Sequence, residues 1–465
     1  MQTNSITGIK EFTTASGTKT LLVFDTKRVA KYNTTNEVLE DIAESDIFTG
    51  DAEDLFWTTN WGDKIYFTNN VDRIKTWDGS SLATPTFDID GDASNEVDTC
   101  LCILPFKERL LLFRTTEDGT VYRQRVRWSG INDPTSWDDT ITGAGGYIDA
   151  PTDESIISVE TVDDGVAIRF TNSWWVLRFT GDIDVPFLFD KIGSTIPECK
   201  STHSIFSNNG VVFTHGFSQI VGTNGSNLMI IDQQVPDVSL KVDQEKNHIL
   251  YSQKYEEYEQ IWIAYTKVDS TTNDRILVYN YRENTWSIYD HPLTCMGITK
   301  TLNDTTWDSE SRTWNEITEA WDDFALQASF PIVLGGKSNG LVVRMQHGSV
   351  DEGSDIDFDI SSSRWNPYAS EGKRAKLMWI DFLVSADDTN SVSIDFFVDF
   401  DSSSYQTSTL NFTSDFNTAD KVWKRLESGA IGSSHRIQIS HTESNQTPKF
   451  HAFVLHFKPQ GRIRQ

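Results

Sequence analysis

A pattern of alternating apolar and polar positions, interrupted by short polar turns, repeats along most of the chain. In residues 64–79, KIYFTNNVDRIKTWDG, Ile65 and Phe67 alternate with polar residues, and a second alternating run carries Ile74 and Trp77. An Asn-Asn turn lies between the two runs. Alternation with a period of two on both sides of such a turn predicts a half-buried β-hairpin. Because an isolated hairpin is unstable in water, neighbouring strands must cover its apolar face.

The same hairpin pattern recurs before and after this segment, at 21–32, 110–128, 167–177, 211–222, 261–286 and 332–345. Each hairpin follows another short apolar segment, and the repeating units are expected to start near Ile9, Asp54, Leu101, Ser155, His203, Asn247 and Leu293. The spacing fits one four-stranded blade of a β-propeller, about 40–50 residues long. Apolar residues do not recur at helical spacing over a dozen positions, so few helices are expected.

We therefore predict an all-β chain whose residues 1–372 form a six- or seven-bladed β-propeller. A pair of β-sandwiches with irregular hairpins is the alternative, since short strands with regular turns fit both architectures. Acidic stretches such as 37–54 and 88–98 join the hairpins and are expected to be solvated loops.

The pattern changes after Arg374. Five cleanly alternating or apolar segments follow, joined by turns rich in Ser, Asp, Asn and Thr. They predict a small antiparallel β-sandwich over residues 373–465. The polar segment 362–376, which contains a proline and a glycine, is the expected hinge between the two domains.

Composition narrows the range of functions. The chain has 465 residues, 40 Lys and Arg against 68 Asp and Glu, and a net charge of −28. Such a surface repels nucleic acid and disfavours a protein that reads DNA sequence, although DNA could slide past a non-adhesive wall. No apolar run approaches the roughly 18 residues of a membrane span, so no membrane insertion is expected. The segment MQTNSITGIK lacks the pattern of a signal peptide, and we expect the protein to stay in the cytoplasm until it assembles.

No catalytic or metal-binding motif stands out. The four cysteines and nine histidines lack zinc-ligand spacing, and buried free thiols are the expected state of the cysteines. The segment FDIDGDASNEVD, with Asp88, Asp90 and Asp92, resembles a calcium loop but lacks the required glycine and glutamate positions, which favours an acidic turn. Phosphate-loop and nucleophile-elbow motifs are absent, and the segments 116–122 and 308–314 only partly match a sialidase Asp-box. The sequence predicts neither an enzyme nor a cofactor.

An insertion near 303–328 carries three tryptophans, Trp307, Trp314 and Trp321, spaced seven residues apart. On a helix they would share one face, whereas a compact loop could pack them against one another or against its own blade. Because tryptophan dominates interface hot spots, these residues are the candidate contact site.

Several segments resemble β-propeller structural proteins of tailed bacteriophages. RVRWSGINDPTSWDD at 125–139 is similar to a segment that closes a blade there, and residues 173–198 and the tryptophan insertion are also similar. The layout of a propeller followed by a sandwich resembles tail hub or nozzle proteins of short-tailed phages, which have no catalytic residues to carry over.

The resemblance implies a virion structural protein, assembled in the cytoplasm of a host bacterium. Six copies would form a ring below the portal and adaptor proteins, and DNA would be ejected through its acidic centre with only non-specific contact. Tail fibres or a plug would attach to the ring. The alternative is a propeller that binds or cleaves carbohydrate during receptor recognition. A cellular interaction scaffold is disfavoured, because the chain lacks WD-type repeat signatures.

Overall fold

The computed structural model describes residues 4–34, 36, 38–43, 45–92, 95–194, 196–235, 238, 241–300, 331–346, 350–351, 354–387, 389–413, 420–442 and 448–462. It divides the chain into unit 1, Met1–Gln346, and unit 2, His347–Gln465. Strands dominate both units. The named helical elements are single 3-10 turns: η1 (Asp232–Gln234), η2 (Asn247–Ile249), η3 (Glu256–Tyr258) and η5 (Ala369–Glu371).

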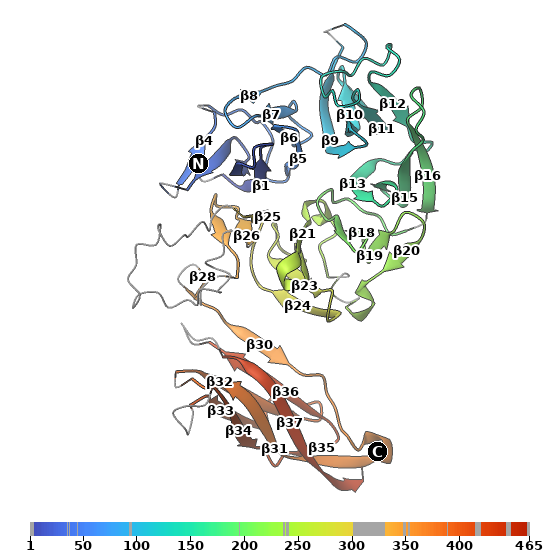
Figure 1. Cartoon of the computed structure of the whole chain (residues 1–465). Helices are drawn as coiled ribbons and strands as arrows, with labels where there is room; N and C mark the ends of the chain where they lie inside the picture. The colour runs from blue at the N-terminus through green and yellow to red at the C-terminus, as the bar shows by residue number, and fades with distance from the viewer. Residues whose placement is uncertain are drawn as a thin grey trace. The chain divides into compact units, whose positions relative to one another are not determined.

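The described residues of unit 1 form seven consecutive antiparallel sheets, in each of which neighbouring strands follow one another in the chain (Figure 1). The first three sheets contain β1 (Ile6–Thr13), β2 (Lys19–Asp25), β3 (Val29–Asn33) and β4 (Val38–Asp41); β5 (Trp57–Trp61), β6 (Lys64–Thr68), β7 (Lys75–Trp77) and β8 (Leu82–Ala83); and β9 (Val97–Phe106), β10 (Arg109–Glu117), β11 (Thr120–Trp128) and β12 (Gly146–Asp149). The next two contain β13 (Ile156–Val162), β14 (Gly165–Phe170), β15 (Ser173–Phe179) and β16 (Phe187–Ser194); and β17 (Phe206–Asn208), β18 (Val211–His215), β19 (Ile220–Thr223) and β20 (Leu228–Ile230). The last two contain β21 (Tyr251–Tyr255), β22 (Gln260–Tyr265), β23 (Arg275–Asn280) and β24 (Thr285–Tyr289); and, with three described strands, β25 (Cys295–Thr299), β26 (Ile332–Gly336) and β27 (Val342–Arg344).

The predicted repeat of four-stranded sheets is confirmed. Each expected start lies within a few residues of the first strand of a sheet, as for Ser155 and β13 or Leu293 and β25. The 64–79 hairpin also forms, with β6 paired to β7. Its description as half-buried was wrong for β6, in which Ile65, Tyr66, Phe67 and Thr68 are all buried. The reason is that neighbouring sheets cover both faces of β6.

Seven hydrophobic clusters lie between successive sheets, and they account for this two-sided burial. Alternate residues of one strand enter different clusters. Leu110 and Leu112 pack toward the second sheet, whereas Leu111 and Phe113 pack toward the fourth. The remaining clusters join the other neighbours, and the last one joins β25–β26 to β1–β2. The seventh sheet therefore packs against the first, and Figure 1 shows the sheets set around a common centre.

In the described part of unit 2, two antiparallel sheets share one hydrophobic core. One sheet has the order β30 (Phe358–Ser361), β36 (His435–His441), β32 (Ser391–Val398) and β33 (Gln406–Asn411). In the other, β31 (Lys373–Ser385) pairs with β34 (Lys421–Glu427), β35 (Ile431–Gly432) and β37 (Phe450–Arg462). A separate short pair is formed by β28 (Val350–Asp351) and β29 (Ser354–Asp355).

The division between the units lies earlier than the 372/373 boundary expected from the sequence. Strand β30 pairs with β36, so residues 358–361 belong to unit 2. A four-residue strand leaves little periodic signal, and its assignment comes from a partner nearly 80 residues away. Among the described residues, no helix is both long enough and apolar enough to cross a membrane.

Candidate functional site

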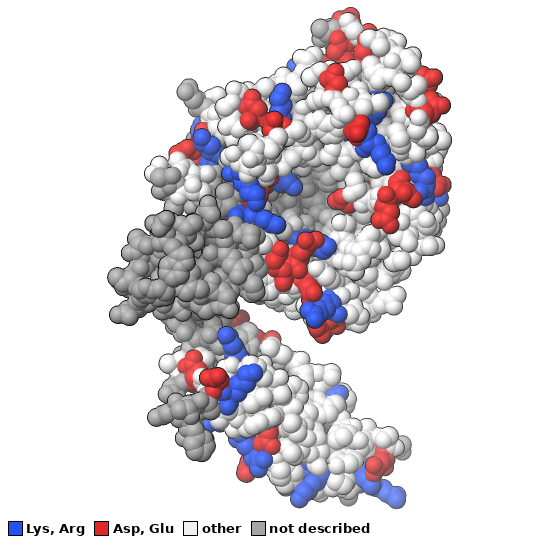
Figure 2. Space-filling view, in the orientation of Figure 1, with Lys and Arg blue, Asp and Glu red and all other residues white. Residues whose placement is uncertain are grey.

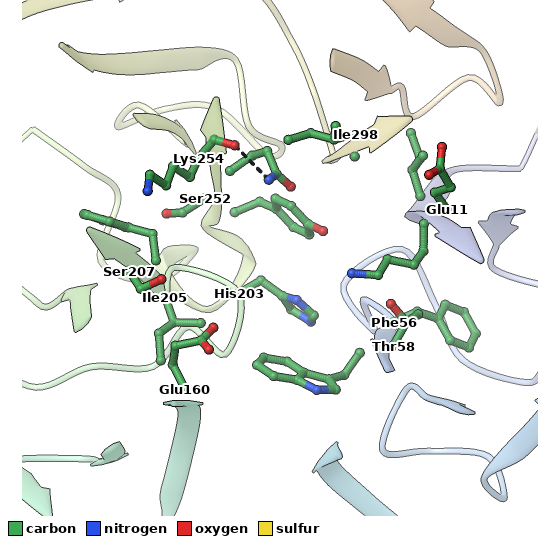
Figure 3. Close-up of a pocket in the computed structure, with 17 residues that line it drawn as sticks. Glu11, Phe56, Thr58, Glu160, His203, Ile205, Ser207, Ser252, Lys254 and Ile298 are labelled. Carbon is green, nitrogen blue, oxygen red and sulfur yellow. Dashed lines mark hydrogen bonds between the residues drawn. The ribbon is translucent and has the colours of Figure 1, made fainter. Parts of the chain in front are cut away.

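A central cavity in unit 1 is the candidate site. Its volume is about 430 Å³, and residues on or beside the first strands of six sheets line it: β1, β5, β13, β17, β21 and β25 (Figure 3). Figure 2 shows one face of unit 1 hollowed near its middle, with both basic and acidic side chains around the hollow. Because six different sheets each contribute residues at their first strand, the packing of the sheets against one another creates the cavity.

Aromatic side chains form one wall. The His203 ring stacks on Tyr251, with ring centroids 5.3 Å apart and an interplanar angle of 5°. The ring centroid of Trp57 lies 5.7 Å from that of His203, with an interplanar angle of 42°. The indole Nε1 of Trp57 donates a hydrogen bond to the carbonyl oxygen of Ile103 at 2.7 Å. Burial lowers the pKa of His203 to about 4, despite an opposing backbone hydrogen bond at Leu55. At neutral pH the wall is therefore uncharged.

Two of the charged residues that line the cavity are already neutralised. Glu11 lies 3.5 Å from the Lys19 ammonium, and its Oε2 accepts a hydrogen bond from the Thr299 hydroxyl at 2.8 Å. Lys254 donates to Glu256 at 3.0 Å. These two side chains therefore contribute little uncompensated charge to the cavity.

Lys10 and Glu160, unlike Glu11 and Lys254, have charged atoms that remain open to a ligand. Within the described part of the chain, no residue forms an ion pair or side-chain hydrogen bond with the Lys10 ammonium. Lys10 is exposed to the solvent of the cavity. The protein atoms around it partly desolvate the ammonium and lower its pKa, whereas the negative charges of Glu160 and Glu11 act to raise it. Glu160 accepts hydrogen bonds from the backbone N–H and hydroxyl of Thr161, both at Oε1, so its Oε2 remains able to accept from a ligand. The cavity thus combines an aromatic wall, a free ammonium and a free carboxylate oxygen.

A second feature lies on the outer face of the β34–β31–β37 sheet in unit 2. We call it the Trp423 patch, and it consists of Asp381, Trp423, Arg425, Val454 and His456 around a shallow hollow. Arg425 donates two hydrogen bonds to Asp381, at 2.7 and 3.0 Å, and His456 Nε2 lies 2.9 Å from Asp381 Oδ2. Trp423 is 53% exposed, so this apolar ring stands beside an ordered polar network.

The residues of the sequence-predicted contact site, Trp307, Trp314 and Trp321, lie outside the described residues. At the expected acidic turn, Asp88 Oδ1 accepts the backbone N–H groups of Asp90 and Gly91, at 3.2 and 2.8 Å. Within the described ranges, no group of three or more His, Cys, Asp or Glu side chains could hold a metal ion. The four cysteines are free and buried.

Sequence reasoning missed both features. Lys10 and Glu160 stand 150 positions apart on unrelated-looking strands, and their shared cavity depends on how the sheets pack. The available signal was limited to charged residues within two strands rich in apolar residues, Lys10 in β1 and Glu160 in β13. Asp381, Arg425 and His456 meet through strand pairing and likewise carry no local motif.

Comparisons with known proteins leave the family open. No protein-family model and no curated protein matches the chain. Two similar solved structures are described as the extracellular domain of a one-component and of a hybrid two-component system from B. thetaiotaomicron. The first has 12% identity and a TM-score of 0.37 over 56% of this chain and 31% of that chain; the second has 10% identity and a TM-score of 0.32 over 56% and 37%. The matches span only about a third of those chains, and they are too distant to support an inference about function.

Proposed function

We propose that unit 1 is a seven-bladed β-propeller, that unit 2 is a β-sandwich, and that the chain is a non-enzymatic structural protein of a short-tailed phage tail. In this proposal several copies, six in our reading, form the hub or nozzle below the portal and adaptor. The basis for the phage assignment is the resemblance of residues 125–139, 173–198 and the insertion near 303–328 to such proteins.

The observation that best supports a mechanical role is the closed series of seven hydrophobic clusters. Both faces of each sheet are covered by neighbours, and β1 packs against β25 and β26. A sheet braced from two sides cannot shift without opening an apolar cluster, which costs free energy in proportion to the exposed area. Such a unit suits a wall that must keep its shape while DNA passes.

The size of the central cavity determines where that DNA would run. A cavity of about 430 Å³ holds a small molecule, whereas the major groove alone of B-DNA is about 12 Å wide. DNA therefore passes through a space enclosed by several copies, and not through the centre of one unit 1. The net charge of −28 keeps the enclosing walls from binding the phosphates.

Contacts between copies, or with fibres or a plug, require an exposed surface, and the Trp423 patch is the best described candidate. Trp and Arg are enriched at interface hot spots. The pairing of Arg425 with Asp381 holds the guanidinium in place before a partner arrives, which reduces the entropy lost on binding.

Mass measurement of the full chain, alone and with portal and adaptor proteins, tests this proposal. We expect a ring of copies in at least the mixed sample and a weaker ring for Trp423→Ala. Phe400→Ala is the matched control, because Phe400 is 85% exposed in the same unit and also lies against an arginine, Arg364, at 5.0 Å. Monomer alone in both samples would contradict the ring. Equal effects of the two variants would show that the Trp423 patch is not a contact surface of the ring. Imaging of particles labelled at the C-terminus would then place the subunit.

A further inference from the structure

We propose that the central cavity of unit 1 binds a small hydroxy-carboxylate of the uronic acid type. Its carboxylate pairs with Lys10, its ring lies against the wall formed by Trp57, His203 and Tyr251, and a hydroxyl group donates to Glu160. This binding goes beyond the structural role and does not depend on whether copies assemble into a ring.

The first reason is an ammonium whose donors are open. Lys10 is exposed to the solvent of the cavity and has no ion-pair or hydrogen-bonding partner among the described residues, although the charges of Glu160 and Glu11 act on it. The other cation of the cavity, Lys254, is already held by Glu256 at 3.0 Å. A ligand carboxylate would supply the missing partner and would form charge-assisted hydrogen bonds with the ammonium.

The second reason concerns the polarity of the rest of the ligand. Glu160 retains an acceptor oxygen, Oε2, that neither hydrogen bond from Thr161 uses. A carboxylate is an acceptor only, so the ligand must present a donor there. A second carboxyl group would be repelled at that place, whereas a hydroxyl group can donate to Oε2 of Glu160 while the ligand carboxylate pairs with Lys10.

The third reason is the aromatic wall. His203 is neutral, and its ring lies parallel to Tyr251 and beside Trp57, so the three rings present an uncharged apolar surface. A cavity of about 430 Å³ is within the range of small-molecule sites. A saccharide ring has an apolar C–H face that can lie on such a surface while its hydroxyl groups turn toward the polar side.

Calorimetry with the full chain tests this binding, with galacturonate as the probe and galactose, the matched neutral sugar, as the control. We expect galacturonate to bind at least tenfold more tightly than galactose. In Lys10→Met that preference should disappear. Lys31→Met is the matched control, because Lys31 lies on β3 of the same sheet, is not among the cavity-lining residues and should leave binding unchanged.

Further comparisons decide between the proposal and its alternatives. Equal affinity for the two sugars, or undiminished galacturonate binding in Lys10→Met, would overturn the proposal. Binding of inorganic phosphate as tight as that of galacturonate would show a general anion site and overturn the role of the aromatic wall. Polygalacturonate separates two sources of the ligand: binding to polymer and monomer supports an acidic residue of a surface polysaccharide, whereas binding to monomer alone supports a free organic acid.

Loss of folding in Lys10→Met is not expected, since the removed ammonium has no ionic partner. If that variant did not fold, the salt dependence of the unaltered chain would replace it. A Lys10–carboxylate pair predicts that galacturonate binding weakens as ionic strength rises while galactose binding does not. Salt-independent galacturonate binding would overturn the proposal. A chain that forms rings but binds no galacturonate would leave the structural function standing.

Discussion

The backbone N–H of Ile6 donates a hydrogen bond to the carbonyl oxygen of Lys337 at 3.1 Å. These residues lie at the start of β1 and just after β26, so the bond joins the first sheet of unit 1 to the seventh. The hydroxyl of Thr294 adds a hydrogen bond to the carbonyl oxygen of Ile6 at 2.5 Å. Ile6, Ile9, Cys295 and Leu334 are buried in the same junction. The seven sheets therefore form one series that residues from both ends of unit 1 close.

A methyl group placed in this junction should destabilise unit 1. In Gly297→Ala the new Cβ would stand 2.6 Å from Ile9 Cγ2 and 2.7 Å from the Ile9 carbonyl oxygen. The backbone would have to move, and we expect a loss of about 1–3 kcal/mol in the free energy of unfolding. Denaturant unfolding measures the change. The control Gly461→Ala meets no atom within 4 Å and should change stability by less than about 0.5 kcal/mol. Equal stability of the two variants would show that the junction is loosely packed.

Removal of one buried carboxylate in the third sheet should cost more. Glu117 lies between Arg125, at 2.8 Å, and Arg127, at 3.0 Å. Burial by itself would raise the pKa of Glu117, but hydrogen bonds and charge from Arg127, with help from Thr115 and Arg125, hold it below its ordinary value. Glu117→Gln removes the buried carboxylate that both guanidinium groups share and leaves each with one partly exposed partner, Asp149 for Arg125 and Asp139 for Arg127. We expect a loss of about 3 kcal/mol, the lower end of the cost of removing one partner of a buried ion pair.

Asp149→Asn is the control for Glu117→Gln, since it removes a carboxylate from the same network at its solvent-exposed end. Asp149 pairs with Arg125 at 2.8 Å, but its side chain is 37% exposed. Exposed ion pairs contribute about 0–1 kcal/mol, so this variant should unfold close to the unaltered chain. A loss as large as that of Glu117→Gln would mean that the network depends on the number of carboxylates and not on their burial.

Acid should destabilise unit 1 through His215 on β18. Burial lowers the pKa of His215 to about 4 from the ordinary value of 6.5, although the charge of Asp232 opposes this shift. Between these two pH values the unfolded chain binds a proton that the folded chain does not, so stability falls as the pH drops from 6.5 toward 4. The contribution of this one residue at pH 5 is about 2 kcal/mol. In His215→Phe the difference in unfolding free energy between pH 7 and pH 5 should shrink by about that amount. An unchanged difference would show that folding does not shift the pKa of His215.

The thiols should be unreactive until the protein unfolds. All four cysteines are buried, and burial raises the pKa of Cys295 to about 12 and that of Cys100 still further. Because the thiolate is the reactive species, a thiol-specific reagent should react slowly with the native chain and fully in denaturant. Rapid reaction of one thiol under native conditions would identify a locally open segment, and single Cys→Ser variants would locate it.

Local patterns were sufficient for the strands and their pairing within each sheet. The 64–79 hairpin is visible because its apolar residues alternate and its turn is rich in asparagine, both of which are properties of a few neighbouring residues. The same information gave the wrong burial for β6. The alternation places Tyr66 on the solvent-facing side of the hairpin, but Tyr66 is buried in the hydrophobic cluster between the second and third sheets, together with Ile103 and Leu112. Strand β30 was assigned to the wrong unit for a related reason, since its partner β36 is remote in sequence.

The amino-acid sequence by itself determined that this protein is made of repeated antiparallel sheets, because period-two alternation and turn residues act over short distances. Only the tertiary structure decided that the seventh sheet packs on the first, that Lys10 and Glu160 face one cavity beside His203, and that Arg425 meets Asp381 near Trp423. These relationships depend on which surfaces come together when apolar faces are buried. The burial of a residue depends on how strands that are distant in sequence pack together, so it cannot be predicted from any single segment of the chain.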